Sequence, residues 1–174
     1  MRHCNGGRSK ICLKMTGRAY YQSPVGPLLI ESSGDKISLL HFLKPDKVKQ
    51  EETLTPVLEL CLRELEEYFF QGRKFFSVEL DPIGSDFQKN VWNNLIDIPY
   101  GRTISYEELA IRTGDIKAIR AVGFANNQNP IAIIIPCHRV IGKNGDLVGY
   151  GGGLETKTWL LQHEGAFSEQ LKLF

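Results

Sequence analysis

The sequence predicts a two-domain α/β protein, in which a small sheet-and-helix domain precedes a mainly helical domain. The first half contains strand-type segments and one amphipathic helix, whereas the second half contains short helices that begin at polar capping residues. Between the halves, Asp81-Pro82-Ile83-Gly84 interrupts both patterns. We therefore place the domain boundary there, which gives domains over residues 15–84 and 85–174.

Two strands are predicted between residues 20 and 42. The turn-forming segment Ser23-Pro24-Val25-Gly26 leads into Leu28-Leu29-Ile30, and Ser33-Gly34-Asp35 leads into Ile37-Ser38-Leu39-Leu40. Apolar runs bounded by Gly, Pro, Ser and Asp are typical of strands joined by turns. The first domain should therefore contain a small sheet.

A helix is predicted after these strands. Thr55 suits the capping position, Pro56 suits the first helical position, and Gly72 marks the end. Cys61 lies beside the apolar face of this helix, so we expect it to be a packing residue. That face consists of Leu58, Leu62, Leu65 and Phe69.

The second domain begins with two helices that have clear start signals. Ser85-x-x-Gln88 is a capping box, and Pro99-Tyr100-Gly101 follows the end of its helix. The apolar stripe of this helix consists of Phe87, Val91 and Leu95. A second capping box, Ser105-x-x-Glu108, begins a short helix that runs through Ala110.

A third helix, from Lys117 to about Asn126, follows the turn Thr113-Gly114-Asp115. Two short helices around a turn that contains glycine are the pattern of a helix-turn-helix. Helical hairpins are also common in proteins that never bind DNA, so the pattern alone does not decide between these functions.

The composition is that of an ordinary globular protein. The chain has 174 residues, of which 42% are hydrophobic and 24% are charged, and this excludes an intrinsically disordered or collagen-like chain. Four cysteines are too few for a disulfide scaffold. No apolar run approaches the roughly 20 residues that a membrane span needs, so we expect no membrane association. The expected location is the cytoplasm, or the nucleus if the source is eukaryotic.

Charge is distributed unevenly, although the net charge is only +1. Residues 44–81 contain six cations and nine acids, whereas residues 116–145 contain no acid. The four cations of the acid-free stretch are Lys117, Arg120, Arg139 and Lys143. Because salt screens charges beyond about 10 Å, a locally cationic surface can bind a polyanion even when the total charge is near zero.

Residues 1–14 are predicted to be a disordered leader. They combine glycines with basic residues, and Ile11-Cys12-Leu13 is too short for the core of a signal peptide. Met15 is an alternative start of the protein.

The strongest candidate nucleophile is Cys137, which follows the apolar run Ile131-Ala132-Ile133-Ile134-Ile135 and precedes His138 and Arg139. Cationic neighbours favour the thiolate form of a cysteine. The alternative is a buried structural cysteine, which is the commoner role of a single cysteine.

Two further features follow Cys137 along the chain. Gly149-Tyr150-Gly151-Gly152-Gly153 lacks the Gly-Lys-Ser/Thr ending of a phosphate-binding loop, and glycines here allow a ligand to approach the backbone. The last helix runs from about Leu154 to His163. Glu164 follows at its carboxyl end, where the helix dipole disfavours an anion. It is either a solvated glutamate or a residue that orients an imidazole.

The sequence resembles the O6-alkylguanine-DNA alkyltransferases, also called methylated-DNA–protein-cysteine methyltransferases, over nearly all of residues 20–165. The likeness includes Ser23-Pro24-Val25-Gly26, Phe87-Gln88-x-x-Val91-Trp92, Ile98-Pro99-Tyr100-Gly101, Ser105-Tyr106, Arg120-Ala121-Val122-Gly123, Asn129-Pro130, Pro136-Cys137-His138-Arg139-Val140, Tyr150-x-Gly152-Gly153-Leu154 and Trp159-Leu160-Leu161-x-His163-Glu164. The resemblance implies a ribonuclease H-like first domain and a second domain with the helix-turn-helix and the active site.

The resemblance also implies direct DNA repair, in which the protein irreversibly takes the alkyl group from O6-alkylguanine and is used once. O4-alkylthymine is a further candidate substrate. By family role, Cys137 accepts the alkyl group, His138 deprotonates it through a water, Glu164 orients His138, and Tyr106 donates a proton or hydrogen bond to the leaving base. The alternative for Tyr106 is a packing aromatic.

The partner implied is double-stranded DNA that contains alkylated bases, bound through the minor groove and largely without sequence preference. Arg120 is expected to fill the gap left by the flipped nucleotide, or otherwise to contact phosphate. The expected DNA-binding residues are Arg120, Ala121, Lys117, Tyr106 and Arg139. The expected base pocket consists of Asn129, Val140, Val148, Tyr150 and Gly151.

No cofactor is expected, and the protein is expected to be a monomer. Some family members bind a structural zinc ion in the first domain. This chain offers no paired ligand spacing for zinc, so we predict no metal. Its candidate ligands are His3, Cys4, Cys12, His41 and Cys61.

Two alternatives from other functional classes remain. One is a DNA-binding protein without chemistry, either a regulator or a lesion binder. The presence of Cys137 counts against it, because the non-catalytic relatives replace the cysteine. The other is a cysteine hydrolase, which needs an oxyanion hole and turns over.

Overall fold

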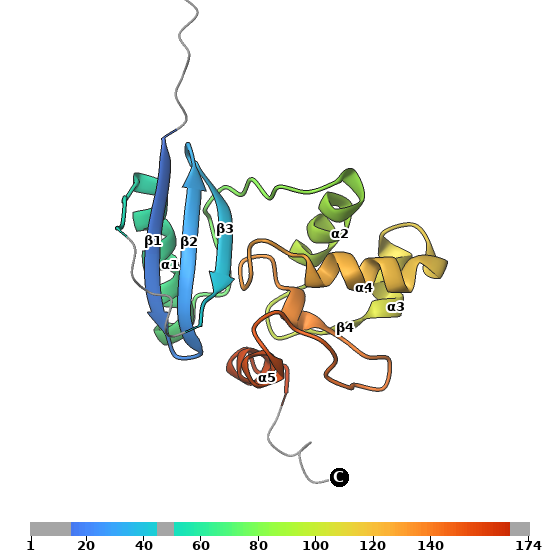
Figure 1. Ribbon diagram of the computed structural model, residues 1–174. Helices are drawn as coiled ribbons and strands as arrows, with labels where there is room; N and C mark the ends of the chain where they lie inside the picture. The colour runs from blue at the N-terminus through green and yellow to red at the C-terminus, as the bar shows by residue number, and fades with distance from the viewer. Residues whose placement is uncertain (1–14, 45–50, 168–174) are drawn as a thin grey trace, which may run out of the picture.

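The computed structural model describes residues 15–44 and 51–167. A three-stranded sheet backed by one helix forms the first part of the chain, and four further helices form the second part (Figure 1). The predicted disordered leader, and with it His3, Cys4 and Cys12, lies outside the described residues.

The sheet is an antiparallel meander of β1 (Thr16–Ser23), β2 (Gly26–Ser33) and β3 (Lys36–Phe42). The sequence predicted only the last two of these strands. The missed strand, β1, has no run of large apolar residues because small residues form its buried face. A side chain at Gly17 would come within 2.7 Å of Leu58, so the helix packs directly against the β1 backbone.

Helix α1 (Pro56–Phe70) begins directly after Thr55, the predicted capping position, although the Thr55 side chain bonds Ser32 and makes no capping hydrogen bond. It packs against all three strands, and its buried face forms the core of this part of the protein (Figure 1). The residues of that face are Leu58, Cys61, Glu64, Leu65, Tyr68 and Phe69. Cys61 is fully buried, in agreement with the packing role expected for it.

The second part contains α2 (Asp86–Ile96), α3 (Tyr106–Arg112), α4 (Ile119–Asn127) and α5 (Leu154–His163). The predicted capping box of α2 is present in full. Ser105 caps α3 as predicted, but the Glu108 side chain pairs with Arg112 instead of closing a capping box. The third predicted helix begins as a 3-10 turn, η2 (Ile116–Ala118), before α4.

The segment that joins α4 to the candidate nucleophile crosses to the sheet. Leu40 of β3 forms backbone hydrogen bonds with Pro130 and Ala132, so this segment extends the edge of the sheet at one point. The apolar run 131–135 is buried as expected, but it forms turns, with Ile133 at a φ of 70°. A branched side chain in this backbone region is strained, so the surrounding packing must hold it.

The end of this segment leads into η3 (Cys137–Arg139) and then β5 (Val140–Ile141), which pairs in parallel with β4 (Ile104–Ser105). The strand pair therefore connects the candidate nucleophile to the start of α3. In the described parts of the chain, no helix is both long and apolar enough to cross a membrane.

Candidate active site

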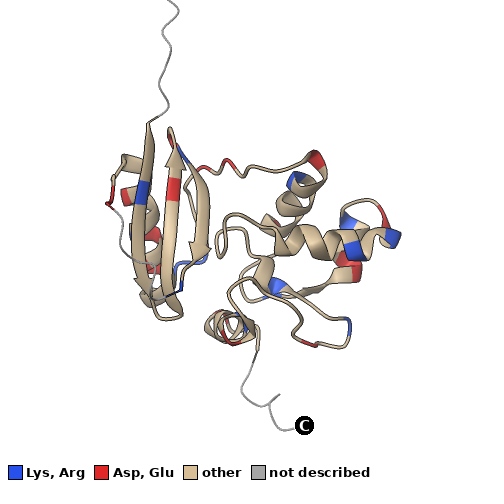
Figure 2. Cartoon of the chain, in the orientation of Figure 1, with Lys and Arg blue, Asp and Glu red and all other residues tan. Residues whose placement is uncertain are grey.

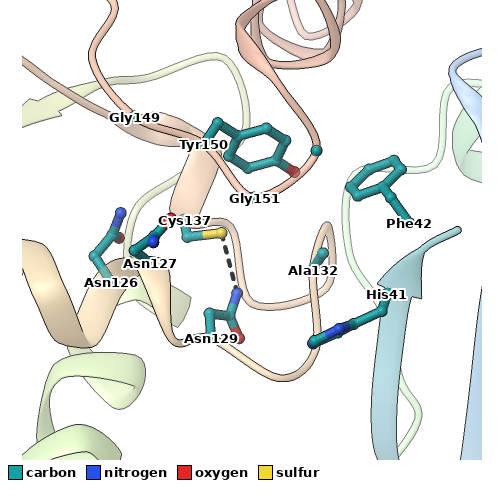
Figure 3. A pocket seen from close by; sticks show the side chains of 11 residues that line it. His41, Phe42, Asn126, Asn127, Asn129, Ala132, Cys137, Gly149, Tyr150 and Gly151 are labelled. Atoms are coloured by element: carbon teal, nitrogen blue, oxygen red, sulfur yellow. Dashed lines mark hydrogen bonds between the residues drawn. The ribbon is translucent and has the colours of Figure 1, made fainter. Parts of the chain in front are cut away.

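Cys137 lies at the start of η3 and is 6% exposed. Its thiol faces a cavity of about 190 Å³. Figure 3 shows Tyr150 and the glycine loop on one side of this cavity, with His41 and Phe42 of β3 across from Cys137. The lining residues are His41, Phe42, Asn126, Asn127, Asn129, Ala132, Cys137, Gly149, Tyr150, Gly151 and Gly152. Both parts of the protein therefore contribute to one pocket around the thiol.

Asn129 holds the turn that positions Cys137. Its side-chain amide donates to the Ile135 carbonyl at 2.8 Å and to the Cys137 Sγ at 3.1 Å (Figure 3), while its Oδ1 accepts from the Ile131 N–H at 3.0 Å. One buried side chain thus spans the strained segment and reaches the thiol. A hydrogen bond donated to sulfur favours the thiolate.

Behind the thiol, Glu164 accepts hydrogen bonds from several buried groups. The His138 Nε2 lies 2.9 Å from Glu164 Oε1, and the Tyr68 hydroxyl donates to the same oxygen at 2.9 Å. Arg139 donates from Nε and Nη2 at 2.8 and 2.9 Å. The sequence could not predict this environment for Glu164, because its partners come from α1, from η3 and from Gly101 in the loop after α2.

Arg139 was expected to contact DNA, and the structure corrects this expectation. Its side chain is 8% exposed, forms a bidentate pair with Glu164 and donates to the Ile98 carbonyl. A guanidinium committed to these partners has no free edge for a phosphate. Arg139 instead neutralises the buried carboxylate.

Two buried titratable groups, Glu164 and His138, lie behind the thiol, and the pKa of each is lowered for a different reason. Burial raises the pKa of Glu164, but hydrogen bonds and charge from His138 and Arg139 outweigh it and hold the pKa well below its usual range. Burial lowers the pKa of His138 more than Glu164 raises it. The imidazole is therefore neutral, with its Nε2 proton donated to Glu164 and its Nδ1 basic. Nδ1 has no hydrogen-bond partner in the described structure, so it is available as a base.

Lys157 is a candidate functional residue that the sequence reasoning missed. It is fully buried on α5, and its Nζ donates to the Val140 and Val148 carbonyls at 2.7 and 3.0 Å. Burial lowers its pKa to about 8, against a smaller opposing effect of Cys137. Its spacing from Leu160 and Leu161, three and four residues later on the buried face, is the signal that could have revealed it.

Lys157 and Asn129 both act on the nucleophile. Burial raises the pKa of the Cys137 thiol, whereas the Asn129 hydrogen bond and the charge of Lys157 oppose this effect. The resting nucleophile is therefore a protonated thiol with a thiolate-stabilising amide and cation already in place.

The other residues expected in the pocket fall into two groups. Asn129, Tyr150 and Gly151 line the cavity, whereas Val140 is fully buried and Val148 is 45% exposed, and neither lines it. Both valines instead offer their carbonyls to Lys157. The missed lining residues His41 and Phe42 lie on a strand far from Cys137 in the sequence, so no local pattern could have revealed them.

Tyr106 lies at the start of α3, with its ring beside Gly123 of α4. Its hydroxyl donates to the Val148 carbonyl at 3.5 Å. Burial and the nearby Cys137 raise the pKa of Tyr106. The hydroxyl therefore keeps its proton and can donate it toward the pocket.

Helix α4 lies next to this pocket and exposes both charged and apolar side chains. Lys117, Arg120 and Ala121 are exposed around its start, and Figure 2 shows Lys and Arg there together with Asp and Glu of α3 and of the turn before η2. Asn127, about two helical turns after Arg120, lines the pocket. Lys117 and Arg120 therefore lie in the same helical segment as a residue of the pocket.

No group of three or more His, Cys, Asp or Glu side chains that could hold a metal is found within residues 15–44 and 51–167. His41 and Cys61, the two candidate ligands inside these ranges, are not brought together with such a group.

Comparisons with known proteins agree over both parts of the chain. The family profile described as "6-O-methylguanine DNA methyltransferase, ribonuclease-like domain" matches residues 18–82, and the corresponding DNA binding domain matches residues 86–166. The methylated-DNA–protein-cysteine methyltransferase of Methanosarcina acetivorans is 47% identical over 156 residues, 85% of this chain and 97% of that protein. The protein of the same name from Haemophilus influenzae is 47% identical over 152 residues, 83% of this chain and 84% of that protein.

Solved structures show the same architecture. The Mycobacterium tuberculosis O6-methylguanine methyltransferase is 42% identical, with a TM-score of 0.76, and the match covers 92% of this chain and 99% of that one. A structure of the Mycobacterium tuberculosis protein OGT in complex with DNA has a TM-score of 0.76 at 44% identity, covering 84% and 91% of the two chains. With its ribonuclease-like and DNA-binding domains both matched, the chain belongs to the 6-O-methylguanine DNA methyltransferase family.

Proposed function

We propose that this protein repairs DNA by transferring an alkyl group from O6-alkylguanine to its own Cys137. The observation that carries the proposal is the Cys137 thiol facing a pocket, with a neutral imidazole and an ion-paired carboxylate directly behind it. The relatives named methylated-DNA–protein-cysteine methyltransferases support the same reaction. The protein is used once, because the thioether formed on Cys137 is stable in water and the thiol is not regenerated.

The reaction is a single displacement. The Cys137 sulfur forms a bond to the alkyl carbon while the bond between that carbon and O6 breaks, and the electron pair passes to the purine. The thiol proton goes to His138 Nδ1 through a water and is then released to solvent. Solvent water supplies one proton to N1 of the guanine, so the base leaves neutral and the enzyme groups return to their resting protonation. Tyr106 assists this departure by donating a hydrogen bond, because a neutral purine is a better leaving group than an anion.

DNA is bound as a duplex through its minor groove, by a monomer, with the cationic start of α4 against the phosphates. The alkylated atom is inaccessible inside the base stack, so the nucleotide must turn out into the pocket. Arg120 occupies the gap in the stack, and Lys117 and Ala121 contact the backbone. Phosphate contacts of this kind do not depend on sequence.

Mass spectrometry tests the proposed function. Incubation with a duplex that contains one O6-methylguanine is expected to add one methyl group to the peptide containing Cys137, with a yield of one per protein. Cys137→Ala should bind the duplex and gain no mass. Tight binding by the natural protein without any gain in mass would identify a lesion-binding protein, and release of free product with repeated turnover would identify a hydrolase.

Arg120→Ala is expected to slow methyl transfer from a duplex about tenfold, because extrusion of a nucleotide costs a few kcal/mol when nothing fills the stack. Transfer from the free O6-methylguanine base should not change. Single-turnover rates with both substrates measure this. Arg63→Ala, at an exposed position on α1, is the matched control. Equal slowing with both substrates would contradict a role in extrusion.

A further inference from the structure

Asn126 is a buried polar residue for which neither the sequence pattern nor the proposed mechanism has a use. It lies near the end of α4, is 3% exposed, and lines the same cavity as Cys137. Figure 3 shows its side chain at the pocket wall next to Asn127 and Cys137. Its Oδ1 has no hydrogen-bond partner in the described structure. A buried acceptor without a partner is costly, so its position points to a donor on the ligand.

The NH₂ group of the Asn126 amide already has a partner, the hydroxyl of Tyr106. Burial and Cys137 raise the pKa of Tyr106, and a hydrogen bond from the Asn126 side chain opposes them. A hydrogen bond that lowers the pKa of a phenol is donated to its oxygen. The amide N–H of Asn126 therefore faces Tyr106, which leaves the Oδ1 as the group offered to a ligand.

The chemistry of the alkylated base identifies the donor. Alkylation of O6 removes the hydrogen from N1, so the exocyclic 2-amino group is the base's only N–H donor. O4-alkylthymine has no N–H donor at all, because its N3 has likewise lost its hydrogen. The Asn126 Oδ1 can thus be satisfied by an alkylated guanine and not by an alkylated thymine.

We propose that Asn126 is a specificity-determining residue whose Oδ1 accepts a hydrogen bond from the 2-amino group of O6-alkylguanine. This inference rests on the proposed function and extends it. The contact favours guanine over thymine adducts and holds the purine between Tyr106 and Cys137. Tyr150, whose buried hydroxyl also has no partner in the described structure, offers a donor to the ring nitrogens of the same base.

The test compares two duplexes that differ only in the 2-amino group, one with O6-methylguanine and one with O6-methylhypoxanthine. The natural protein should demethylate the guanine substrate at least about tenfold faster, because the second base leaves a buried acceptor unpaired. Asn126→Leu, which keeps the shape of the side chain without its polar atoms, should reduce this ratio to about one. Asn126→Ala provides the same comparison if leucine disturbs α4.

The ratio separates base recognition from an indirect effect through Tyr106. Loss of the Tyr106 hydrogen bond slows both substrates equally and leaves the ratio unchanged. Asn93→Leu, at an exposed position on α2 outside the pocket, is the control and should keep the natural ratio. Equal rates of the natural protein on both duplexes, or an unchanged ratio in Asn126→Leu and Asn126→Ala, would overturn the inference while leaving alkyl transfer intact. If no methyl group is transferred from the O6-methylguanine duplex or from the O6-methylhypoxanthine duplex, the proposed function itself is contradicted.

Discussion

Glu164→Gln is expected to slow methyl transfer by about 10²–10⁴-fold and to lower the free energy of unfolding by about 3–5 kcal/mol. The carboxylate accepts hydrogen bonds from His138 and Tyr68 and is paired with Arg139 at 2.8 Å. Glutamine removes the charge and leaves the Arg139 guanidinium buried without a counterion. It also presents a donor to His138, so the basic Nδ1 is no longer specified. Single-turnover rates and urea unfolding measure the two effects.

A double variant separates catalysis from stability in this network. In Glu164→Gln/Arg139→Met no unpaired charge remains, and an apolar replacement for a buried ion pair is often neutral. Most of the lost stability should therefore return, while transfer remains slow because His138 still lacks its carboxylate. If transfer recovers together with stability, Glu164 has only a structural role.

Acid should weaken the same network. The pKa of Glu164 is lower in the folded protein than the ordinary value of 4.5. Its contribution to the free energy of unfolding is therefore complete above about pH 4.5 and declines as the pH falls below that value toward the folded-state pKa.

Lys157→Met is expected to slow methyl transfer at pH 7 by about 10–100-fold and to move the pH–rate profile toward higher pH. The ammonium opposes the effect of burial on the pKa of the Cys137 thiol, so its loss leaves a less acidic nucleophile. Methionine keeps the apolar stem but cannot donate to the Val140 and Val148 carbonyls. The glycine loop that follows Val148 then loses its tether to α5.

The stability of the two proteins should also diverge with pH. The pKa of Lys157 is about 8 in the folded protein, compared with 10.5 ordinarily. Between these values the unfolded chain binds the extra proton, so the free energy of unfolding rises with pH by a contribution that Lys157→Met lacks. Lys143→Met, at an exposed lysine, is the control for both measurements. A profile of Lys157→Met that coincides with that of the natural protein would show that the ammonium does not act on the thiol.

Local rules predicted most of the elements correctly. The helix starts at Thr55, Ser85 and Ser105 and the last helix over Leu154–His163 are confirmed, because capping and apolar periodicity act within a few residues. The strand Thr16–Ser23 was missed because its buried face is made of small residues, whose place in the core depends on the helix packed against them. Whether a segment forms a helix is indicated by residues close to it in the sequence. Whether a small residue is buried depends on distant segments that pack against it.

Some residues of the candidate site were indicated by the local sequence, whereas the roles of others were revealed only by the fold. Cys137 and His138 adjoin each other in the sequence, and Glu164 stood out because an anion at a helix carboxyl end is unfavourable without a partner. Arg139 was expected among the DNA-binding residues, and only the fold revealed that its charge is paired internally with Glu164. Lys157 looked like an ordinary helical lysine until the packing of α5 placed it inside the protein.

The sequence by itself determined the order of the five helices, the two-part organisation and a candidate nucleophile with its adjacent imidazole. The tertiary structure decided which charged groups are buried together and which surfaces meet around the thiol. His41 and Phe42 of β3 and Asn126 of α4 reach one cavity only because the backbone of residues 130–132 joins the edge of the sheet. Burial and charge pairing depend on groups far apart along the chain, so they exist only once the chain has folded.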